Sequence, residues 1–164
     1  MKVTIALVIP VLLVCVYFFY QGNASAAIAP PLLSGGKLAI CGSRQNCVSS
    51  LQDSSDDHYI EPIESGTQTA EELANNVASA IESLGGTVTG NDGRIIQATF
   101  TSAIFKFVDD VQVRIDTDNH QVRSSSRVGY SDLGVNRKRI ERLDKLCNEQ
   151  FSLTPAFANR LKLR

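Results

Sequence analysis

Three segments of alternating residues, RIIQATFTS (Arg94–Ser102), DVQVRID (Asp110–Asp116) and HQVRSSSRV (His120–Val128), decide the fold. In each segment every second side chain is apolar or small and its neighbours are polar, so the two kinds lie on opposite faces of a strand. This pattern, with one buried and one solvated face, is typical of antiparallel sheets. The turn sequence Asn91–Gly93 joins Arg94–Ser102 to a short strand at Thr87–Thr89 as a hairpin. We therefore predict an antiparallel sheet of about four strands.

Helical patterns precede and follow these strands. Thr69–Leu84 begins with a capping box between its first residue and Glu72, repeats apolar residues on one face, and is ended by Gly85. A second helix follows the strands, with Asn136 as its expected N-cap and Cys147 on its apolar face, where a buried core thiol is expected. This order of elements predicts an α+β fold, in which two helices pack on one face of the antiparallel sheet.

The N-terminus carries a nearly unbroken apolar run, Val3–Tyr20, preceded by Lys2. A run of this length is close to the minimum of about 18 to 20 residues that crosses the hydrocarbon core of a bilayer. The positive-inside rule leaves Lys2 in the cytoplasm and the rest of the chain on the other side. The run is either a retained membrane anchor or a cleavable signal peptide, for which Ala24 and Ala26 supply the small residues before the cleavage site. We expect an extracytoplasmic domain, either anchored in the inner membrane and facing the periplasm or secreted to the periplasm after cleavage.

The remainder of the chain is long enough for one domain with a single core. Four segments follow from these patterns: a signal peptide or membrane anchor at residues 1–26, a linker at 27–37, the α+β domain at 38–153 and a basic tail at 154–164. Within the domain, residues 38–66 show no sustained period and are rich in Ser, Asp and Gly. We therefore expect these residues to form an ordered but irregular arm.

Two cysteines, Cys41 and Cys47, lie in this arm and enclose the five residues Gly42–Asn46. In an oxidising compartment such a pair closes a small disulfide loop, and free thiols are the alternative. A zinc site is disfavoured, because the spacing differs from the gap of roughly two to four residues in zinc knuckles. No second pair of His or Cys follows to complete such a site.

Composition and charge exclude several classes of protein. The net charge is −1, no nucleic-acid-binding motif is present and export is expected, so nucleic acid is excluded as a partner. The chain has no G-x-S-x-G nucleophile elbow, and its two histidines are poorly placed for catalysis. His120 lies at a hairpin turn, where a solvated side chain is expected, and His58 lies in the irregular arm. Neither a metal-ligand cluster nor a cofactor motif stands out.

Three blocks of sequence carry a resemblance to a known family: CGSRQNCVSS (Cys41–Ser50), FKFVDDVQVRID (Phe105–Asp116) and RSSSRVGYSDLGVNRKRIERL (Arg123–Leu143). In this order and spacing, the chain resembles the bacterial and plastid family catalogued as domain of unknown function 1499, over nearly all of the exported domain. The third block is the most specific, since such a long run of small, charged and glycine positions rarely matches by chance. The first block departs from the family, whose members often carry proline where this chain has Gln45. The resemblance implies a small envelope or lumen domain and assigns it no activity.

Residues of the second and third blocks are the candidates for a ligand-binding site: Asp109, Asp110, Arg123, Ser126, Arg127, Gly129, Asp132, Gly134, Asn136 and Arg139. The connection 129–136 contains two glycines and runs into a helix, so its backbone N–H groups suit an anion, to which Arg127 and Arg139 add a bidentate grip. The adjacent Asp109 and Asp110 point to opposite faces, which argues against a paired-carboxylate dyad. The alternative is structural: an Asp pairs with an Arg of the next strand, and Asp132 satisfies local backbone donors.

These observations favour a non-catalytic domain of the cell envelope that binds a small anionic or lipidic ligand, or a protein partner, through the Arg127–Arg139 region. The chain also contacts the membrane through residues 3–20 if the leader is not cleaved. A second hypothesis is a small hydrolase or transferase that uses Asp109 or Asp110 with Arg127 and Asp132. A third hypothesis is a structural assembly factor, which would co-purify with a stable protein partner.

Overall fold

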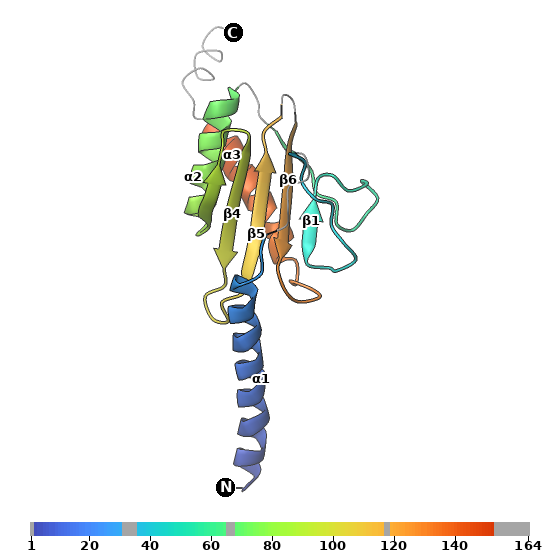
Figure 1. Cartoon of the computed structure of the whole chain (residues 1–164), viewed down its shortest axis with the longest axis vertical. Helices are drawn as coiled ribbons and strands as arrows, with labels where there is room; N and C mark the ends of the chain where they lie inside the picture. Colours follow the sequence, from blue (N-terminus) through green and yellow to red (C-terminus); the bar gives the residue numbers. More distant parts are fainter. Residues whose placement is uncertain (1, 31–35, 65–67, 117–118, 153–164) are drawn as a thin grey trace.

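The computed structural model describes residues 2–30, 36–64, 68–116 and 119–152. These residues form a sheet-and-helix body from which one long helix projects at one end (Figure 1). In chain order the elements are α1 (Lys2–Ala26), β1 (Cys47–Ser49), β2 (Ile63–Glu64), α2 (Ala70–Ser83), β3 (Thr87–Asn91), β4 (Ile95–Thr101), β5 (Val108–Arg114), β6 (Asn119–Ser126) and α3 (Val135–Ser152). The predicted α+β fold with an antiparallel sheet is confirmed. The basic tail predicted for residues 154–164 lies outside the described residues.

The sheet is antiparallel, with strand order β1-β6-β5-β4-β3 and with β2 pairing separately with the start of β6. The described residues contain six strands rather than the predicted four, and three helices including α1. The two unpredicted strands, β1 and β2, lie in the region 38–66 that we expected to be irregular. β1 has three residues, all buried, and β2 has two, so neither is long enough to show an alternating pattern. Pairing with β6 determines their positions instead: Cys47 lies opposite Ser125, and Ile63 lies opposite His120.

Helices α2 and α3 cover one face of the sheet and bury the hydrophobic core against it (Figure 1). The core joins apolar residues of both helices to alternate residues of the central strands, among them Val77, Ile81, Ile96, Val111, Val113, Val122, Ile140 and Leu143. The predicted capping box of α2 is present between Thr69 and Glu72. Gly85 ends this helix with a φ of +85°, in the left-handed region that favours glycine. Cys147 is buried in the core as predicted, and its burial raises the pKa of the thiol to about 12.

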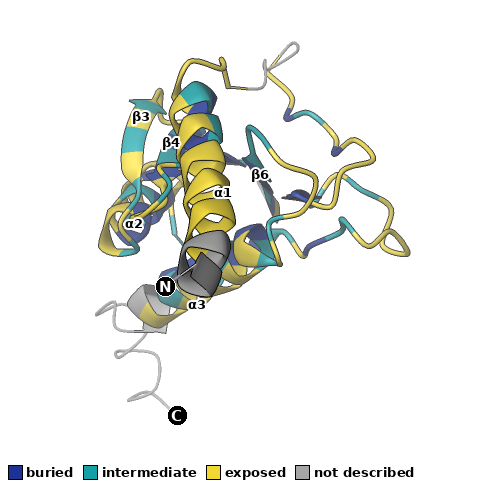
Figure 2. Cartoon of the chain, turned by 90° about the horizontal axis from the view of Figure 1, so that it is seen from below, coloured by how far each residue is buried: buried dark blue, intermediate teal, exposed yellow. Residues whose placement is uncertain are grey.

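Helix α1 carries apolar side chains around its whole circumference. Its large apolar residues from Val8 to Tyr20 are exposed, and the middle of the helix is drawn as exposed in Figure 2. Val8–Ala26 is long and apolar enough to cross a membrane, although a signal sequence near an N-terminus meets the same criterion. A helix that is apolar on every side is stable only when lipid or protein covers it. The structure therefore shows an N-terminal apolar helix of the kind predicted.

The expectation that His120 is solvated is wrong. Strand β6 begins one residue before it, and His120 lies on the same face as Val122, toward the core. The residue is 2% exposed, and its Nδ1 accepts a hydrogen bond from the N–H of Asp116 at 3.1 Å. Burial lowers the pKa of His120, and the nearby charge of Asp116 opposes this shift only in part. The side chain is a neutral core residue.

The face of the sheet opposite the helices is more buried than the alternating pattern predicted. Asp110 and Arg123 have their side chains on this face, yet they are only 2% and 8% exposed. Ile28 and Ala29 after α1, together with residues 42–44, 46 and 47, border a hollow with these two residues. The polar face of β5 and β6 is therefore the floor of a pocket.

The predicted disulfide between Cys41 and Cys47 is present. It closes the loop Gly42–Asn46, which contributes to the wall of this pocket. Asn46 holds the loop against the end of β6, because its Nδ2 donates to the carbonyl oxygens of Gly129 at 2.7 Å and of Ser126 at 3.3 Å. The cross-link and this asparagine together fix the position of the loop.

Replacing both Cys41 and Cys47 with alanine is expected to lower the free energy of unfolding by about 2 kcal/mol. A cross-link that closes a short loop removes roughly this much chain entropy from the unfolded state. Urea denaturation of the double variant and of the oxidised wild type measures the difference. Cys15→Ala, which removes an exposed thiol of α1, is the control and leaves the midpoint unchanged. Equal midpoints for the double variant and the wild type would show that the disulfide adds nothing to stability.

Candidate functional site

The candidate residues lie on both faces of the sheet instead of forming one site. Asp109 and Asp110 are consecutive in β5, and consecutive side chains of a strand point to opposite faces. Asp109 pairs with Arg139 of α3 on the helix side, whereas Asp110 pairs with Arg127 on the other side. The prediction that the two carboxylates point apart is confirmed. Arg127 and Arg139, which we predicted to bind one anion together, therefore lie on opposite faces of the sheet.

On the helix side, Asn136 is the centre of a buried hydrogen-bond network and is 0% exposed. Its Oδ1 accepts hydrogen bonds from Ser124 Oγ and from Arg139 Nη1. Its Nδ2 donates to Ser126 Oγ at 3.0 Å and to the backbone oxygen of Asn46 at 3.1 Å. One side chain thus ties α3 to β6 and to the disulfide loop, and both of its polar atoms have partners.

The guanidinium of Arg139 is also bound by other side chains of the protein. Its Nη2 donates to Asp109 Oδ2 at 2.6 Å, and its guanidinium lies over the ring of Phe100, 4.4 Å from the ring centroid. The side chains of Arg139 and Asp109 are 11% and 13% exposed. A paired cation that is also stacked on an aromatic ring is a structural link between α3 and the sheet.

The expected anion site at the start of α3 is filled by the chain's own carboxylate. Asp132 accepts hydrogen bonds from the N–H of Gly134 at 3.0 Å and from the N–H of Asn136 at 2.7 Å. These are the unpaired donors that a helix N-terminus offers to an anion. Asn136 is therefore not the N-cap that we predicted, since α3 begins at Val135 and Asp132 accepts from its first turn. The structural interpretation of Asp132 is correct.

Asp110 and Arg127 form a bidentate ion pair on the other face, beside the end of α1. Arg127 Nε lies 2.9 Å from Asp110 Oδ2, and Nη2 lies 2.8 Å from Oδ1. The remaining nitrogen, Nη1, donates to the carbonyl oxygens of Ser25 and Ala26 at 3.4 and 3.3 Å. The hydrogen bonds to Asp110 raise the pKa of Arg127 further, although burial opposes this. Arg127 thus supplies a positive charge at the C-terminus of α1, where the helix dipole favours one.

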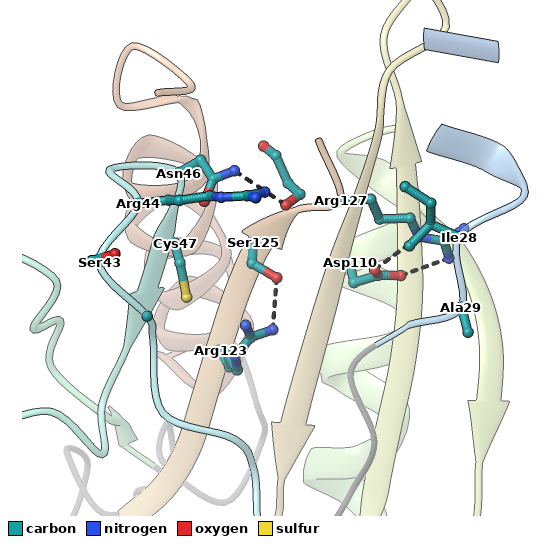
Figure 3. A pocket seen from close by; sticks show the side chains of 12 residues that line it. Ile28, Ala29, Ser43, Arg44, Asn46, Cys47, Asp110, Arg123, Ser125 and Arg127 are labelled. Carbon is teal, nitrogen blue, oxygen red and sulfur yellow. Dashed lines mark hydrogen bonds and ion pairs between the residues drawn. The ribbon is translucent and has the colours of Figure 1, made fainter. Parts of the chain in front are cut away.

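A hollow of about 410 Å³ lies next to this ion pair (Figure 3). Its floor is the polar face of β5 and β6, with Arg123 and Ser125, and Arg44 extends from the disulfide loop on one side. Among the described residues, three arginines and one aspartate border it, and that aspartate is already neutralised by Arg127. The two remaining cations, Arg44 and Arg123, make the hollow positive.

Arg123 is the unusual group in this hollow. The residue is 92% buried, and its pKa is lowered by desolvation, which the charge of Asp110 counteracts only in part. Its Nη1 donates to Ser125 Oγ at 2.6 Å, whereas its Nε has no hydrogen-bond partner within the part of the chain that the structure describes. Arg123 also forms no ion pair with the described carboxylates. A buried guanidinium with an unsatisfied N–H is costly unless an anion compensates it.

Sequence reasoning selected Arg123 but missed Arg44, Ser125 and the disulfide loop as parts of the same hollow. Arg44 and Arg123 are far apart in the chain, and they meet only because β1 pairs with β6. β1 itself had no alternating pattern, so nothing in the local sequence placed this loop beside Arg123. The one available signal was that both residues fall in the blocks CGSRQNCVSS and RSSSRVGYSDLGVNRKRIERL.

Of the four residues of the hydrolase hypothesis, Asp110 and Arg127 come together as an ion pair, whereas Asp109 and Asp132 bind other groups. Asp109 and Asp110 are on opposite faces and each is bound by an arginine, while Asp132 accepts from the first turn of α3. His58 pairs with Asp56 and its Nε2 lies 3.0 Å from the backbone oxygen of Arg44, and the bond to Asp56 raises the pKa of His58. Among the described residues, no three His, Cys, Asp or Glu side chains lie close enough together to hold a metal ion.

A family model described as "Protein of unknown function (DUF1499)" matches residues 37–146. No curated protein matches the chain. The matched region begins just before the disulfide loop and ends within α3. It includes all the residues that border the hollow except Ile28 and Ala29, which follow α1.

Proposed function

Because the chain belongs to the DUF1499 family, whose description assigns no activity, we propose a function from the site itself: an extracytoplasmic, membrane-anchored domain that binds a small anion at Arg123. The ligand chemistry is a carboxylate or a phosphate group. The single observation that carries this proposal is the buried Arg123 guanidinium, which borders the hollow and forms no ion pair with the described carboxylates.

The geometry of arginine supports an oxyanion as the ligand. A guanidinium offers parallel N–H groups that match the two oxygens of a carboxylate or phosphate, and such charge-assisted bonds are stronger than neutral ones. One nitrogen of Arg123, Nη1, is held by Ser125, and the side chain borders the hollow where the ligand would bind. Arg44, on the exposed disulfide loop, adds a second positive charge at the rim. A volume of about 410 Å³ is in the range of small-ligand pockets.

The proposed location rests on α1 and on the disulfide. An apolar helix near the N-terminus that begins at Lys2 favours export of the residues that follow it. A disulfide between Cys41 and Cys47 persists in oxidising compartments and is rare in the cytosol. The contacts of Ser25 and Ala26 with Arg127 support a retained anchor, because cleavage after Ala26 would remove these partners. We therefore place the domain on the outer side of the inner membrane.

Calorimetry on the full chain in detergent micelles tests the anion site, with inorganic phosphate and acetate as soluble probes. Arg123→Met is expected to weaken binding by about tenfold or more, because one charge-assisted hydrogen bond is worth at least about 1.5 kcal/mol. The same variant keeps or raises the melting temperature, since it replaces an uncompensated buried cation with an apolar side chain. Arg94→Met, which removes an exposed arginine from the far hairpin, is the matched control and binds like the wild type.

Vesicles distinguish a soluble anion from a lipid phosphate. If phosphatidylglycerol vesicles compete with inorganic phosphate and phosphatidylcholine vesicles do not, the anion is carried on a lipid. If neither vesicle competes, it is a soluble ion. Unchanged affinity of Arg123→Met for every probe, with the fold intact, would rule out Arg123 as the binding group.

A further inference from the structure

We propose that the end of the domain from which α1 projects rests on the phospholipid bilayer that α1 spans. The docking surface consists of the β4–β5 turn (102–107) and of Tyr130 in the connection between β6 and α3. Its occupant is the interfacial layer of the lipid. The proposal rests on the membrane anchor of the proposed function, but not on the anion site.

Aromatic contacts place the β4–β5 turn at the level of the membrane surface. The ring centroids of Phe18 and Phe105 are 5.5 Å apart, and those of Phe18 and Phe107 are 6.3 Å apart. Phe18 is two residues before Tyr20, where the apolar run ends, which is about 3 Å along a helix. If the apolar run fills the hydrocarbon core, the turn lies beside its last helical turn, at the boundary with the headgroups.

Close packing holds α1 in this position. A Cβ at Gly22 would lie 1.6 Å from the backbone oxygen of Phe105, so only glycine permits the helix to approach the turn this closely. Ser25 is fully buried, and its Oγ accepts a hydrogen bond from the N–H of Val108, the first residue of β5, at 3.0 Å. Arg127 binds the last carbonyl oxygens of the helix. The depth of α1 in the membrane therefore determines the depth of the β4–β5 turn.

The side chains exposed at this end suit a lipid interface. Ile104 at the tip of the turn is 73% exposed, and Tyr130 is 67% exposed. Tyr130 lines a hollow together with Gln21, the first residue of α1 after the apolar run, so it lies beside the helix at the same level. Tyrosine is enriched where a membrane meets water, and isoleucine gains free energy by leaving water for the acyl chains. The connection that carries Tyr130 and the β4–β5 turn lie at the same end of the body (Figure 1).

This orientation brings the pocket to the level of the headgroups. The hollow beside Gln21 shares Ile28, Arg44 and Arg127 with the hollow around Arg123. The two hollows therefore adjoin. The hollow around Arg123 thus lies next to the point where α1 leaves the hydrocarbon core.

The absence of tryptophan from the chain provides a direct test. Ile104→Trp places a single tryptophan at the tip of the turn, and Arg94→Trp places one beyond the opposite end of β4, about 20 Å away along the strand. The full-length variants are reconstituted into phosphatidylcholine vesicles with brominated acyl chains. Trp at 104 is expected to have blue-shifted emission and to lose most of its intensity to bromine quenching. Trp at 94 keeps the emission of a solvated indole.

Tyr130→Trp is the second variant, for the case that Ile104→Trp does not fold. It is expected to be quenched as well. Emission from positions 104 and 130 that is as weakly quenched as that from position 94 would overturn the proposal, and so would equal quenching at all three positions. Adding Arg123→Met to the Ile104→Trp variant leaves the quenching unchanged, so a failure of the anion site and a failure of the docking surface are told apart.

Discussion

Asp110→Ala is expected to lower the free energy of unfolding by about 3 kcal/mol, because it leaves the Arg127 guanidinium without its carboxylate. The side chains of the pair are 3% and 10% exposed, so water does not replace the lost partner efficiently. Arg127 keeps only the carbonyl oxygens of Ser25 and Ala26, at 3.4 and 3.3 Å. Urea denaturation of the full chain, followed by tyrosine fluorescence, measures the loss.

Two control variants show whether the loss comes from the buried charge. Combining Asp110→Ala with Arg127→Met removes both charges and is expected to recover part of the stability, since apolar replacements of a buried ion pair are often tolerated. Glu149→Ala breaks the exposed pair with Lys145, whose side chains are 75% and 57% exposed, and is expected to have almost no effect. An Asp110→Ala variant as stable as the wild type would contradict a structural role for the pair and would favour a role in binding.

Asn136→Ala is expected to lower the free energy of unfolding by about 3 kcal/mol as well. The substitution removes the acceptor of Ser124 and Arg139 and the donor to Ser126, inside a network that water does not reach. A buried polar group that loses its partner costs about 1 to 3 kcal/mol, and more than one group is affected here. The melting temperature of the variant measures the effect.

Asn75→Ala provides the matched control, because Asn75 is an exposed asparagine in helix α2. This control is expected to leave stability unchanged or slightly raised, since alanine is the better helix former. Equal melting temperatures for Asn136→Ala and Asn75→Ala would mean that the network around Asn136 does not hold α3 to the sheet.

The parts of the fold that local patterns determine could be predicted from the sequence. Apolar and polar side chains alternate in residues 94–102 and 110–116 because the apolar ones face α2 and α3. The structure has β4 and β5 in these two segments. The capping box between Thr69 and Glu72 is a local interaction within one helical turn, and it is present. The disulfide was predictable because Cys41 and Cys47 are close in the chain.

The remaining features depend on contacts between distant segments. β1 has no period of its own and exists because Cys47–Ser49 pairs with β6. Its position near a turn predicts a solvated His120. However, His120 is two residues before Val122 in β6, so both side chains lie on the same face of the strand, in the core. A helix N-terminus predicts that an anion binds there. No sequence pattern reveals that the carboxylate of Asp132 already accepts the hydrogen bonds of this N-terminus.

The candidate site changed for the same reason. The sequence groups Arg123 with nearby residues, most of which contact one another in the structure. The structure instead brings Arg123 together with Arg44 of the disulfide loop and with Ile28 after α1. Only the pairing of β1 with β6 and the position of α1 create this neighbourhood, so neither composition nor spacing predicts it.

The most direct test of the anion site is the proton–nitrogen correlation of Arg123 Nε–Hε in the isotopically labelled full chain, followed as inorganic phosphate is added. Its resonance is assigned by its absence from the spectrum of Arg123→Met. We expect this resonance to move and to saturate with the same affinity as calorimetry gives, because an anion bound to the guanidinium changes the electrostatic environment of its Nε–H group. A resonance that stays in place while phosphate binds, or a chain that binds none of the probes, would contradict the account.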